Sequence, residues 1–209
     1  MHNGTKRTVS ADGGSITERI PVYVMAGGHS SRFGSDKLRA PLDGETALGH
    51  VLRAVVPWSS GTVVVADRAG RYDDLGAPTL GDLEPHLGPA GGLLTALEHA
   101  TAPWILAVSG DMPVLRGPWM RALLDARAPG VSAVAFFGER WQPLPVLLHR
   151  NARDALRARV GAGERALWRL LDHVGATTVT LPEDWPERSG INTTEDLAFF
   201  EARLAQELP

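Results

Sequence analysis

Short apolar runs recur along this chain, and amphipathic stretches lie between them. Most runs are apolar at consecutive positions rather than at every second one, which is typical of strands covered on both faces. They span residues 20–26, 62–66, 104–109, 131–137, 144–149 and 177–181. Alternating strands and helices indicate βαβ units. The chain is therefore predicted to form an α/β fold with a mostly parallel central sheet and helices on both faces.

The amphipathic stretches have the spacing of helices that bury one face. Between Leu48 and Val56, apolar residues fall at i, i+3, i+4, i+7 and i+8, which makes one stripe along a helix. Thr193 and Asp196 have the spacing of a loose capping box before the last predicted helix. Shorter stripes predict helices around residues 93–97, 120–124, 167–174 and 197–204.

The composition is that of a globular protein, and it excludes several classes of function. Of the 209 residues, 44% are hydrophobic and 22% charged, and the formal net charge is −3. A chain this close to neutral is not a general nucleic-acid binder, and it has no polybasic or apolar segment suited to a membrane. There is no cysteine, which excludes thiolate nucleophiles and cysteine-bound metals. Neither a nucleic acid nor a membrane is expected as a partner.

The first 17 residues differ from the rest of the chain. Residues 1–17 are polar and glycine-rich and lack the apolar core of a signal peptide, so they are expected to form a disordered leader. Residues 18–209 are expected to form a single domain. The expected location is the cytoplasm.

A loop rich in glycine and basic residues, 26–37, follows the first predicted strand. Gly27 and Gly28 allow backbone N–H groups to approach an anion closely. Arg32 and Lys37 add positive charge to the same loop. A polyphosphate ligand suits this chemistry, although the loop is neither a Walker A motif nor GxGxxG. The alternative is an ordinary glycine-rich turn with two solvated bases.

Three further polar residues lie where strands or loops lead into new elements. Asp111 follows a buried run, and because Mg²⁺ prefers one or two carboxylates plus phosphate oxygens, it is the candidate metal ligand. An Asx-type turn is the alternative. Asn192 is either a second oxygen ligand or a polar turn residue. Asp82 precedes segment 87–92, whose glycines and proline leave backbone N–H groups free for a ligand or simply permit tight packing.

Taken together, these motifs resemble those of nucleotidyltransferases related to molybdenum cofactor guanylyltransferase. They follow the family's order between residues 20 and 200. Residues 26–37 resemble the signature LAGGxSxRMGxDK, residues 88–92 a GPLAG segment, residues 110–113 a CDMP segment, residues 142–144 a substrate-side QP segment and residues 191–197 an NxNTPEDL ending.

The resemblance implies a Rossmann-like nucleotidyltransferase fold that uses GTP and Mg²⁺. By this resemblance, backbone groups after the first strand hold guanine and ribose, Lys37 reaches the phosphates, and Asp111 binds the metal. The expected nucleotide-binding residues are Met25, Ala26, Gly27, Gly28, Lys37, Asp82 and Asp111. The expected catalytic residues are Lys37, Arg32 and Asp111, and the expected metal ligands are Asp111 and Asn192.

The chain departs from the family pattern at four positions. Met25 replaces a leucine, and Gly110 replaces a cysteine. Ala66 stands where some members have an asparagine that contacts the nucleotide. Gly190 stands where the first asparagine of NxN would be, which leaves one amide ligand rather than two.

The expected function is transfer of GMP from GTP to molybdenum-bound molybdopterin, with release of pyrophosphate. A transient contact with a molybdoenzyme or its chaperone is part of this expectation. The nearest alternatives are a cytidylyltransferase for the same cofactor and another nucleotidyltransferase that acts on a small phosphorylated acceptor. An alternative of a different class is a nucleotide-binding module without catalysis.

Overall fold

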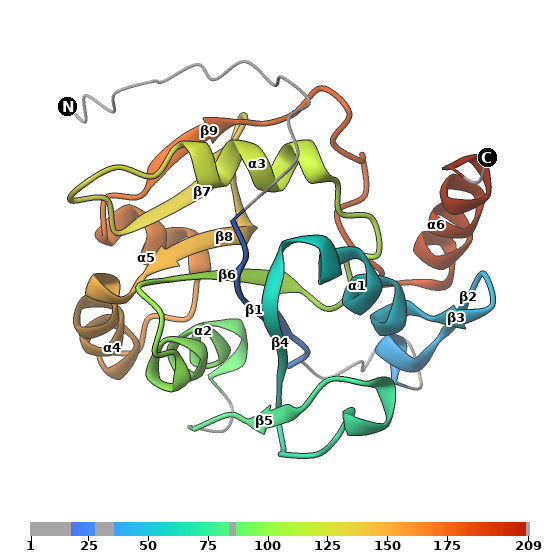
Figure 1. Cartoon of the computed structure of the whole chain (residues 1–209), viewed down its shortest axis with the longest axis horizontal. Coiled ribbons are helices and arrows are strands. Elements are labelled where there is room, and N and C mark those ends of the chain that lie inside the picture. The colour runs from blue at the N-terminus through green and yellow to red at the C-terminus, as the bar shows by residue number, and fades with distance from the viewer. Residues whose placement is uncertain (1–17, 28–35, 84–86, 208–209) are drawn as a thin grey trace.

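A seven-stranded sheet forms the centre of the molecule, with strand order β5-β4-β1-β6-β8-β7-β9 (Figure 1). The computed structural model describes residues 18–27, 36–83 and 87–207, so the expected leader lies outside the described residues. Strands β5, β4, β1 and β6 are parallel to one another, β8 is antiparallel to both its neighbours, and β7 and β9 are parallel. The strands are β1 Ile20–Met25, β4 Ser59–Ala66, β5 Thr79–Gly81, β6 Trp104–Ser109, β7 Ala133–Phe137, β8 Trp141–His149 and β9 Thr177–Thr180.

Helices cover both faces of the sheet, as predicted. On one face lie α1 (Ala47–Val55), α3 (Gly117–Asp125) and α6 (Thr194–Glu207); on the other lie α2 (Gly88–His99), α4 (Arg153–Gly161) and α5 (Leu167–His173). The sheet separates two hydrophobic cores, one under each layer of helices. Strand β1 contributes to both cores, because side chains alternate across a strand.

Val22 and Val24 belong to the core under α1 and α3, whereas Tyr23 and Met25 belong to the core under α2. A strand that is buried on both faces has apolar residues at consecutive positions. The apolar run predicted as the first strand is buried on both faces in the structure, which confirms the predicted α/β class.

Two parts of the sheet were not predicted. Strand β5 has only three residues, too few to show a periodic pattern. Strand β8 runs antiparallel to β6, with Ala107 opposite Val146. Its direction could not be predicted, because the composition of a strand does not indicate which way it runs. Since β8 is reversed, its first residues, from Trp141 onward, lie toward the edge where the parallel strands end.

Small elements follow the strand ends. The 3₁₀ turn η1 (Lys37–Arg39) leads into a short hairpin of β2 (Pro41–Leu42) and β3 (Glu45–Thr46). Another 3₁₀ turn, η3 (Asp73–Leu75), lies between β4 and β5. These elements place two loops beside the carboxyl ends of β1 and β4 (Figure 1).

The predicted capping box at the start of α6 is confirmed. The Thr193 Oγ1 atom accepts from the backbone N–H of Asp196 at 3.2 Å, and Asp196 Oδ2 accepts from the N–H of Thr193 at 2.9 Å. Asp196 also accepts from the N–H of Asn192 at 2.9 Å. These bonds satisfy donors that a helix start leaves without partners, and they fix the loop that carries Asn192.

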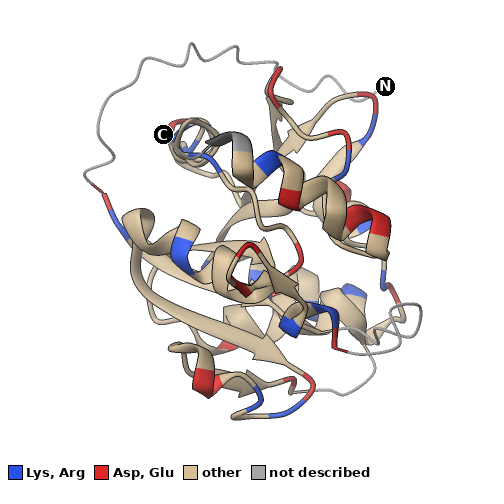
Figure 2. Ribbon diagram, turned by 90° about the vertical axis from the view of Figure 1, so that its right-hand side faces the viewer, with Lys and Arg blue, Asp and Glu red and all other residues tan. Residues whose placement is uncertain are grey.

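The charged residues are distributed over the molecule rather than segregated. In the view of Figure 2, acidic and basic segments are interspersed along the ribbon. Within the described ranges, no helix is both long enough and apolar enough to cross a membrane.

Candidate active site

The carboxyl ends of β1, β4 and β6 bring the predicted nucleotide-binding residues together. The backbone N–H of Ala26 donates to Val65 O at 2.8 Å, and that of Gly110 donates to Met25 O at 2.9 Å. The N–H of Asp82 donates to Ala66 O at 2.8 Å. The sheet hydrogen bonding therefore continues just past the strand ends, at the edge where α/β proteins bind ligands.

The Asp82 carboxylate lies close to two glycines, Gly27 and Gly92. A Cβ atom at Gly27 would be 3.7 Å from Asp82 Oδ2, and one at Gly92 would be 3.7 Å from Asp82 Oδ1 and 3.1 Å from the Met25 sulfur. A side chain at either position would therefore contact the carboxylate or the Met25 sulfur, and glycine leaves this space free. Ala66 ends β4 beside Asp82 and brings no polar side chain.

The Asp82 carboxylate is not satisfied by the described part of the chain. Its Oδ1 atom is buried and has no hydrogen-bond partner there. Burial raises the pKa of this carboxyl to about 6, and the negative charge of Asp67 adds to the effect. A buried acceptor without a partner costs about 1–3 kcal/mol. Such a cost is typical of a group kept for a ligand that donates hydrogen bonds.

Asp82→Asn is expected to stabilise the protein at neutral pH. The pKa of Asp82 is raised from 3.8 to about 6 on folding, so the folded state holds the proton more tightly. The free energy of unfolding therefore falls as pH rises from about 4 to about 6 and stays lower above that range. With allowance for solvent screening, the gain from asparagine is about 1–2 kcal/mol at pH ~7.5.

Urea denaturation across this pH range measures the effect. The gain should shrink as the pH falls toward about 4, because Asp82 is then protonated in the folded state and begins to be protonated in the unfolded state as well. Asp154→Asn, which removes a carboxylate that is 79% exposed, serves as the control and should change stability little. A variant Asp82→Asn that is less stable than the parent at neutral pH would contradict the account.

Lys37, Asp111 and Asn192 converge from three separate parts of the chain. The Lys37 ammonium donates to Asp111 Oδ2 at 2.5 Å and to Asn192 Oδ1 at 3.0 Å. Lys37 comes from η1, Asp111 from the turn after β6, and Asn192 from the loop before α6. The side chains of Lys37 and Asp111 are each 20% exposed, so the pair can still be reached by a ligand.

The second oxygen of Asp111 is also held. Ser109, the last residue of β6, donates its hydroxyl to Asp111 Oδ1 at 2.5 Å. The backbone carbonyl of Asp111 accepts from the N–H of Ile191 at 2.8 Å. The carboxylate is therefore oriented before any ligand arrives, as electrostatic catalysis requires.

Two departures from the family pattern have a steric explanation. A Cβ atom at Gly190 would be 2.8 Å from Asp111 Oδ1 and 3.2 Å from the Asp111 carbonyl oxygen. A Cβ atom at Gly110 would be 3.0 Å from Met25 O. In this arrangement a larger residue at either position would displace Asp111 or the end of β1.

The oxygen atoms around Lys37 suit a hard cation. Asp111 Oδ2 and Asn192 Oδ1 already converge on one cation, the Lys37 ammonium. Mg²⁺ takes oxygen ligands and is usually bound by one or two carboxylates plus phosphates and water. Among the described residues, no group of three or more His, Cys, Asp or Glu has metal-binding geometry. A metal at Asp111 and Asn192 would complete its shell from phosphates and water.

The structure places most of the predicted site residues in one region. Met25, Ala26, Gly27 and Asp82 lie on one side of the β1 end, and Lys37, Asp111 and Asn192 lie on the other. Gly28 and Arg32 lie outside the described residues. Sequence reasoning did not find Ser109, whose contact with Asp111 depends only on spacing within a turn.

A mostly parallel sheet, a glycine-rich sequence after its first strand and a lysine–carboxylate pair at the carboxyl ends of its strands are typical of a nucleotide-binding α/β enzyme. Residues 22–178 match the model of the MobA-like NTP transferase domain. The chain belongs to this family and is a nucleotidyltransferase. The expected Rossmann-like nucleotidyltransferase fold is confirmed.

Named relatives match most of the chain. It is 31% identical to a molybdenum cofactor guanylyltransferase of Serratia proteamaculans over 86% of this chain and 92% of that protein. It is 29% identical to a probable molybdenum cofactor guanylyltransferase of Aquifex aeolicus, with 91% and 94% covered. The solved structure of molybdopterin-guanine dinucleotide biosynthesis protein A from Archaeoglobus fulgidus shares the fold, with a TM-score of 0.74, 23% identity and 89% and 99% covered.

Proposed function

We propose that this enzyme transfers GMP from GTP to molybdenum-bound molybdopterin and releases pyrophosphate, forming molybdopterin guanine dinucleotide. The observation that carries the proposal is the convergence of Lys37, Asp111 and Asn192 beside the turn after β1. The names of the relatives support the choice of nucleotide and acceptor.

The reaction needs charge and alignment rather than a protein nucleophile. A phosphate oxygen of the acceptor attacks the α-phosphorus of GTP, a new P–O bond forms, and the bond to the bridging oxygen of the β-phosphate breaks. The electron pair leaves with pyrophosphate. The acceptor phosphate is already an anion, so no serine or cysteine has to be activated. Two mutually repelling anions must be held together, which positive charge and preorganised donors achieve.

The residues at the carboxyl ends of the strands have separate roles in the proposed reaction, and one group of them binds the nucleotide. In the proposal, backbone groups of Met25, Ala26, Gly27 and Gly28 hold guanine and ribose. The unpartnered Oδ1 of Asp82 accepts from donors of the nucleotide. Guanine supplies such donors at N1 and N2, whereas the pairing edge of cytosine has only one, the amino group.

Lys37 and Arg32 supply the positive charge in the proposal. The Lys37 ammonium is a compact donor on a flexible stem that suits a phosphate, and Arg32 comes from the same signature. Mg²⁺ held by Asp111 and Asn192 would neutralise charge on the phosphates. A cation bound there competes with the Lys37 ammonium for the same two oxygens.

The acceptor and other partners form part of the same proposal. The first residues of β8 lie toward the active edge of the sheet and include Gln142 and Pro143 of the substrate-side motif. We place the molybdenum-bound molybdopterin on this side. The proposed location is the cytoplasm, where a molybdoenzyme or its chaperone would receive the product.

Thermal-shift titration with Mg²⁺ tests the nucleotide choice. GTP is expected to bind about 5- to 150-fold more tightly than CTP, because the smaller base leaves a buried polar group without a partner at a cost of about 1–3 kcal/mol. ATP is also expected to bind more weakly than GTP. A ligand present at about 100 times its Kd stabilises a protein by about 2.7 kcal/mol, which such a titration detects.

The same titration contains its own controls. Asp82→Asn should reduce the shift with GTP more than the shift with CTP. A larger shift with CTP than with GTP at equal concentration would assign the enzyme to cytidylyl transfer. The absence of a shift with any nucleotide at millimolar concentration would contradict the proposal.

A further inference from the structure

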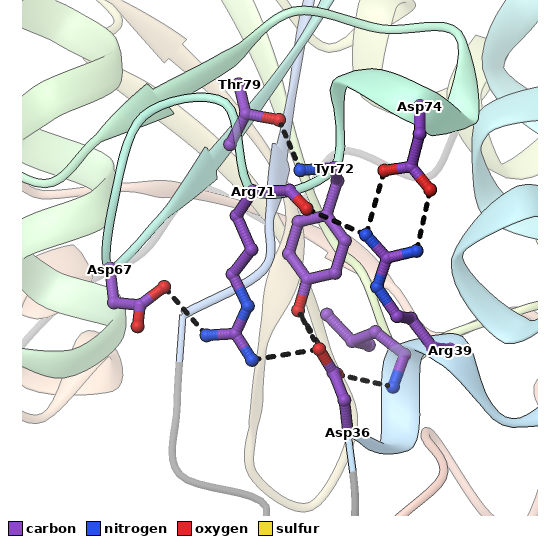
Figure 3. A network of polar contacts seen from close by, with 8 residues as sticks. Asp36, Arg39, Asp67, Arg71, Tyr72, Asp74 and Thr79 are labelled. Atoms are coloured by element: carbon purple, nitrogen blue, oxygen red, sulfur yellow. Dashed lines mark hydrogen bonds and ion pairs between the residues drawn. The ribbon is translucent and has the colours of Figure 1, made fainter.

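The segment that carries Lys37 is fastened by the loop between β4 and β5, as Figure 3 shows. Tyr72 donates its hydroxyl to the Asp36 carboxylate, at 2.9 Å from Oδ2 and 3.1 Å from Oδ1. Arg71 donates from Nη2 to Asp36 Oδ2 at 2.8 Å and from Nη1 to Asp67 Oδ1 at 2.7 Å. The residue before Lys37 is thus tied to two side chains of a distant loop.

The other end of η1 is tied to the same loop. Arg39 donates from its two terminal nitrogens to Asp74, at 2.7 and 2.8 Å. It also donates to the backbone carbonyl of Arg71 at 2.8 Å. Two parallel bonds between a guanidinium and a carboxylate fix orientation as well as distance. The two residues on either side of the Lys37–Leu38 segment, Asp36 and Arg39, are therefore both held by the loop between β4 and β5.

Asp36 joins this anchor to the backbone of η1. It is the N-cap of the turn, and its Oδ1 accepts from the N–H of Leu38 at 3.2 Å. Its carbonyl oxygen accepts from the N–H of Arg39 at 2.9 Å. The carboxylate that Tyr72 and Arg71 hold is the same group that sets the conformation at Lys37.

Burial and hydrogen bonds fix the position of Tyr72, which donates to Asp36. Its side chain is almost fully buried, at 1% exposure, and its backbone N–H donates to Thr79 Oγ1 at 3.1 Å. The guanidinium carbons of Arg39 and Arg71 each lie 5.2 Å from the centre of its ring. Burial and the neighbouring Asp36 raise the pKa of the hydroxyl, so it remains protonated and keeps donating.

We propose that Tyr72 and Arg71 are positioning residues that act through Asp36 to aim the Lys37 ammonium. This inference rests on the proposed role of Lys37 at the phosphates. A lysine side chain is long and flexible, so its backbone must be fixed, because a misplacement of its charge by about 1 Å relative to the reacting phosphate can cost about 10²-fold in rate. The contact between Lys37 and Asp111 then depends on a network on the far side of η1.

Tyr72→Phe tests the proposal because it removes only the hydroxyl that reaches Asp36. The kcat for pyrophosphate release is expected to fall about tenfold with little change in KM, as for a group that acts in the transition state. Tyr23→Phe is the matched control. Tyr23 is also buried, at 3% exposure, and its hydroxyl bonds His99 at 2.8 Å, away from η1; its kcat should stay within about twofold of the parent.

A double-mutant cycle separates positioning from a general loss of structure. In a Lys37→Ala background, Tyr72→Phe should lower kcat by less than about twofold, because the group it positions is gone. An equal loss in both backgrounds would overturn the proposal. So would an unchanged kcat for Tyr72→Phe in the parent chain.

Hydrogen exchange in the free protein gives a readout that needs no substrate. The amides of Leu38, Arg39 and Ala40, all bonded within η1 or its cap, should exchange about tenfold faster in Tyr72→Phe and at the parent rate in Tyr23→Phe. Unchanged exchange at these amides would overturn the proposal. If the parent releases no pyrophosphate from GTP, the proposed function fails, and the exchange result still decides whether Tyr72 holds η1.

Discussion

Asp111→Ala is expected to abolish turnover while the protein stays folded. The substitution removes the carboxylate that Lys37 and Ser109 both contact and the principal candidate metal ligand. In the proposed function, loss of this preorganised charge and of the metal that it would hold is expected to lower kcat by at least about 10³-fold. The backbone bond from Ile191 to the Asp111 carbonyl does not involve the side chain, so the loop packing should survive.

Pyrophosphate release and circular dichroism measure the two parts of this result. Asp125→Ala is the control, because Asp125 lies on α3, away from Lys37. It forms an ion pair with Arg121, and its side chain is 41% exposed. This variant should leave kcat near the parent value. Near-native activity of Asp111→Ala would remove this residue from the mechanism, and loss of folding would assign it a structural role.

Lys37→Ala is expected to lower kcat/KM by at least about 10²-fold, because one preorganised charge on the developing anion is lost. Its stability should change little, since the side chain is partly exposed and an ion pair of this kind contributes about 1 kcal/mol or less. Steady-state pyrophosphate release at varied GTP concentration is the measurement.

Lys37→Arg provides a stricter comparison. It keeps the charge but replaces a compact ammonium by a planar fork, and the space between Asp111 Oδ2 and Asn192 Oδ1 is matched to the smaller group. It should therefore recover only part of the lost rate. An unchanged kcat/KM in Lys37→Ala would contradict the assignment.

Local patterns in the sequence predict the layers of the fold but not every neighbour within the sheet. The run at Val22–Val24 is continuous because β1 is buried on both faces by two helix layers. Three residues of β5 carry no period, and the antiparallel direction of β8 follows from a long-range pairing of Ala107 with Val146. Pairing partners far apart in the chain are decided by packing, which a local pattern does not record.

In the candidate site, too, local patterns predict some features, and others depend on contacts between distant parts of the chain. Glycine-rich turns and polar residues at strand ends are local signals, and they predict Gly27, Lys37 and Asp111 as neighbours of one edge. The anchoring of Asp36 by Tyr72 joins residues 36 positions apart, and a lone tyrosine in a loop has no local signature. The raised pKa of Asp82 depends on burial that only the packed structure creates.

The glycines at positions 110 and 190 add a further point. The sequence alone indicates only that a cysteine and an amide ligand of the family pattern are missing at these positions. The structure shows a positive reason for each, since a Cβ atom at Gly190 would press on the Asp111 carboxylate and one at Gly110 on the Met25 carbonyl. Close approach of backbone and side chain is the usual reason for glycine in such places.

Pyrophosphate release from the purified protein tests guanylyl transfer to molybdopterin. The protein is incubated with Mg²⁺, molybdenum-bound molybdopterin and either GTP, CTP or ATP. Pyrophosphate is expected to appear with GTP, in proportion to a product that contains guanine, and Asp111→Ala and Lys37→Ala are expected to lose this release. Faster release with CTP would indicate cytidylyl transfer, and nucleotide binding without any release would exclude guanylyl transfer by this protein.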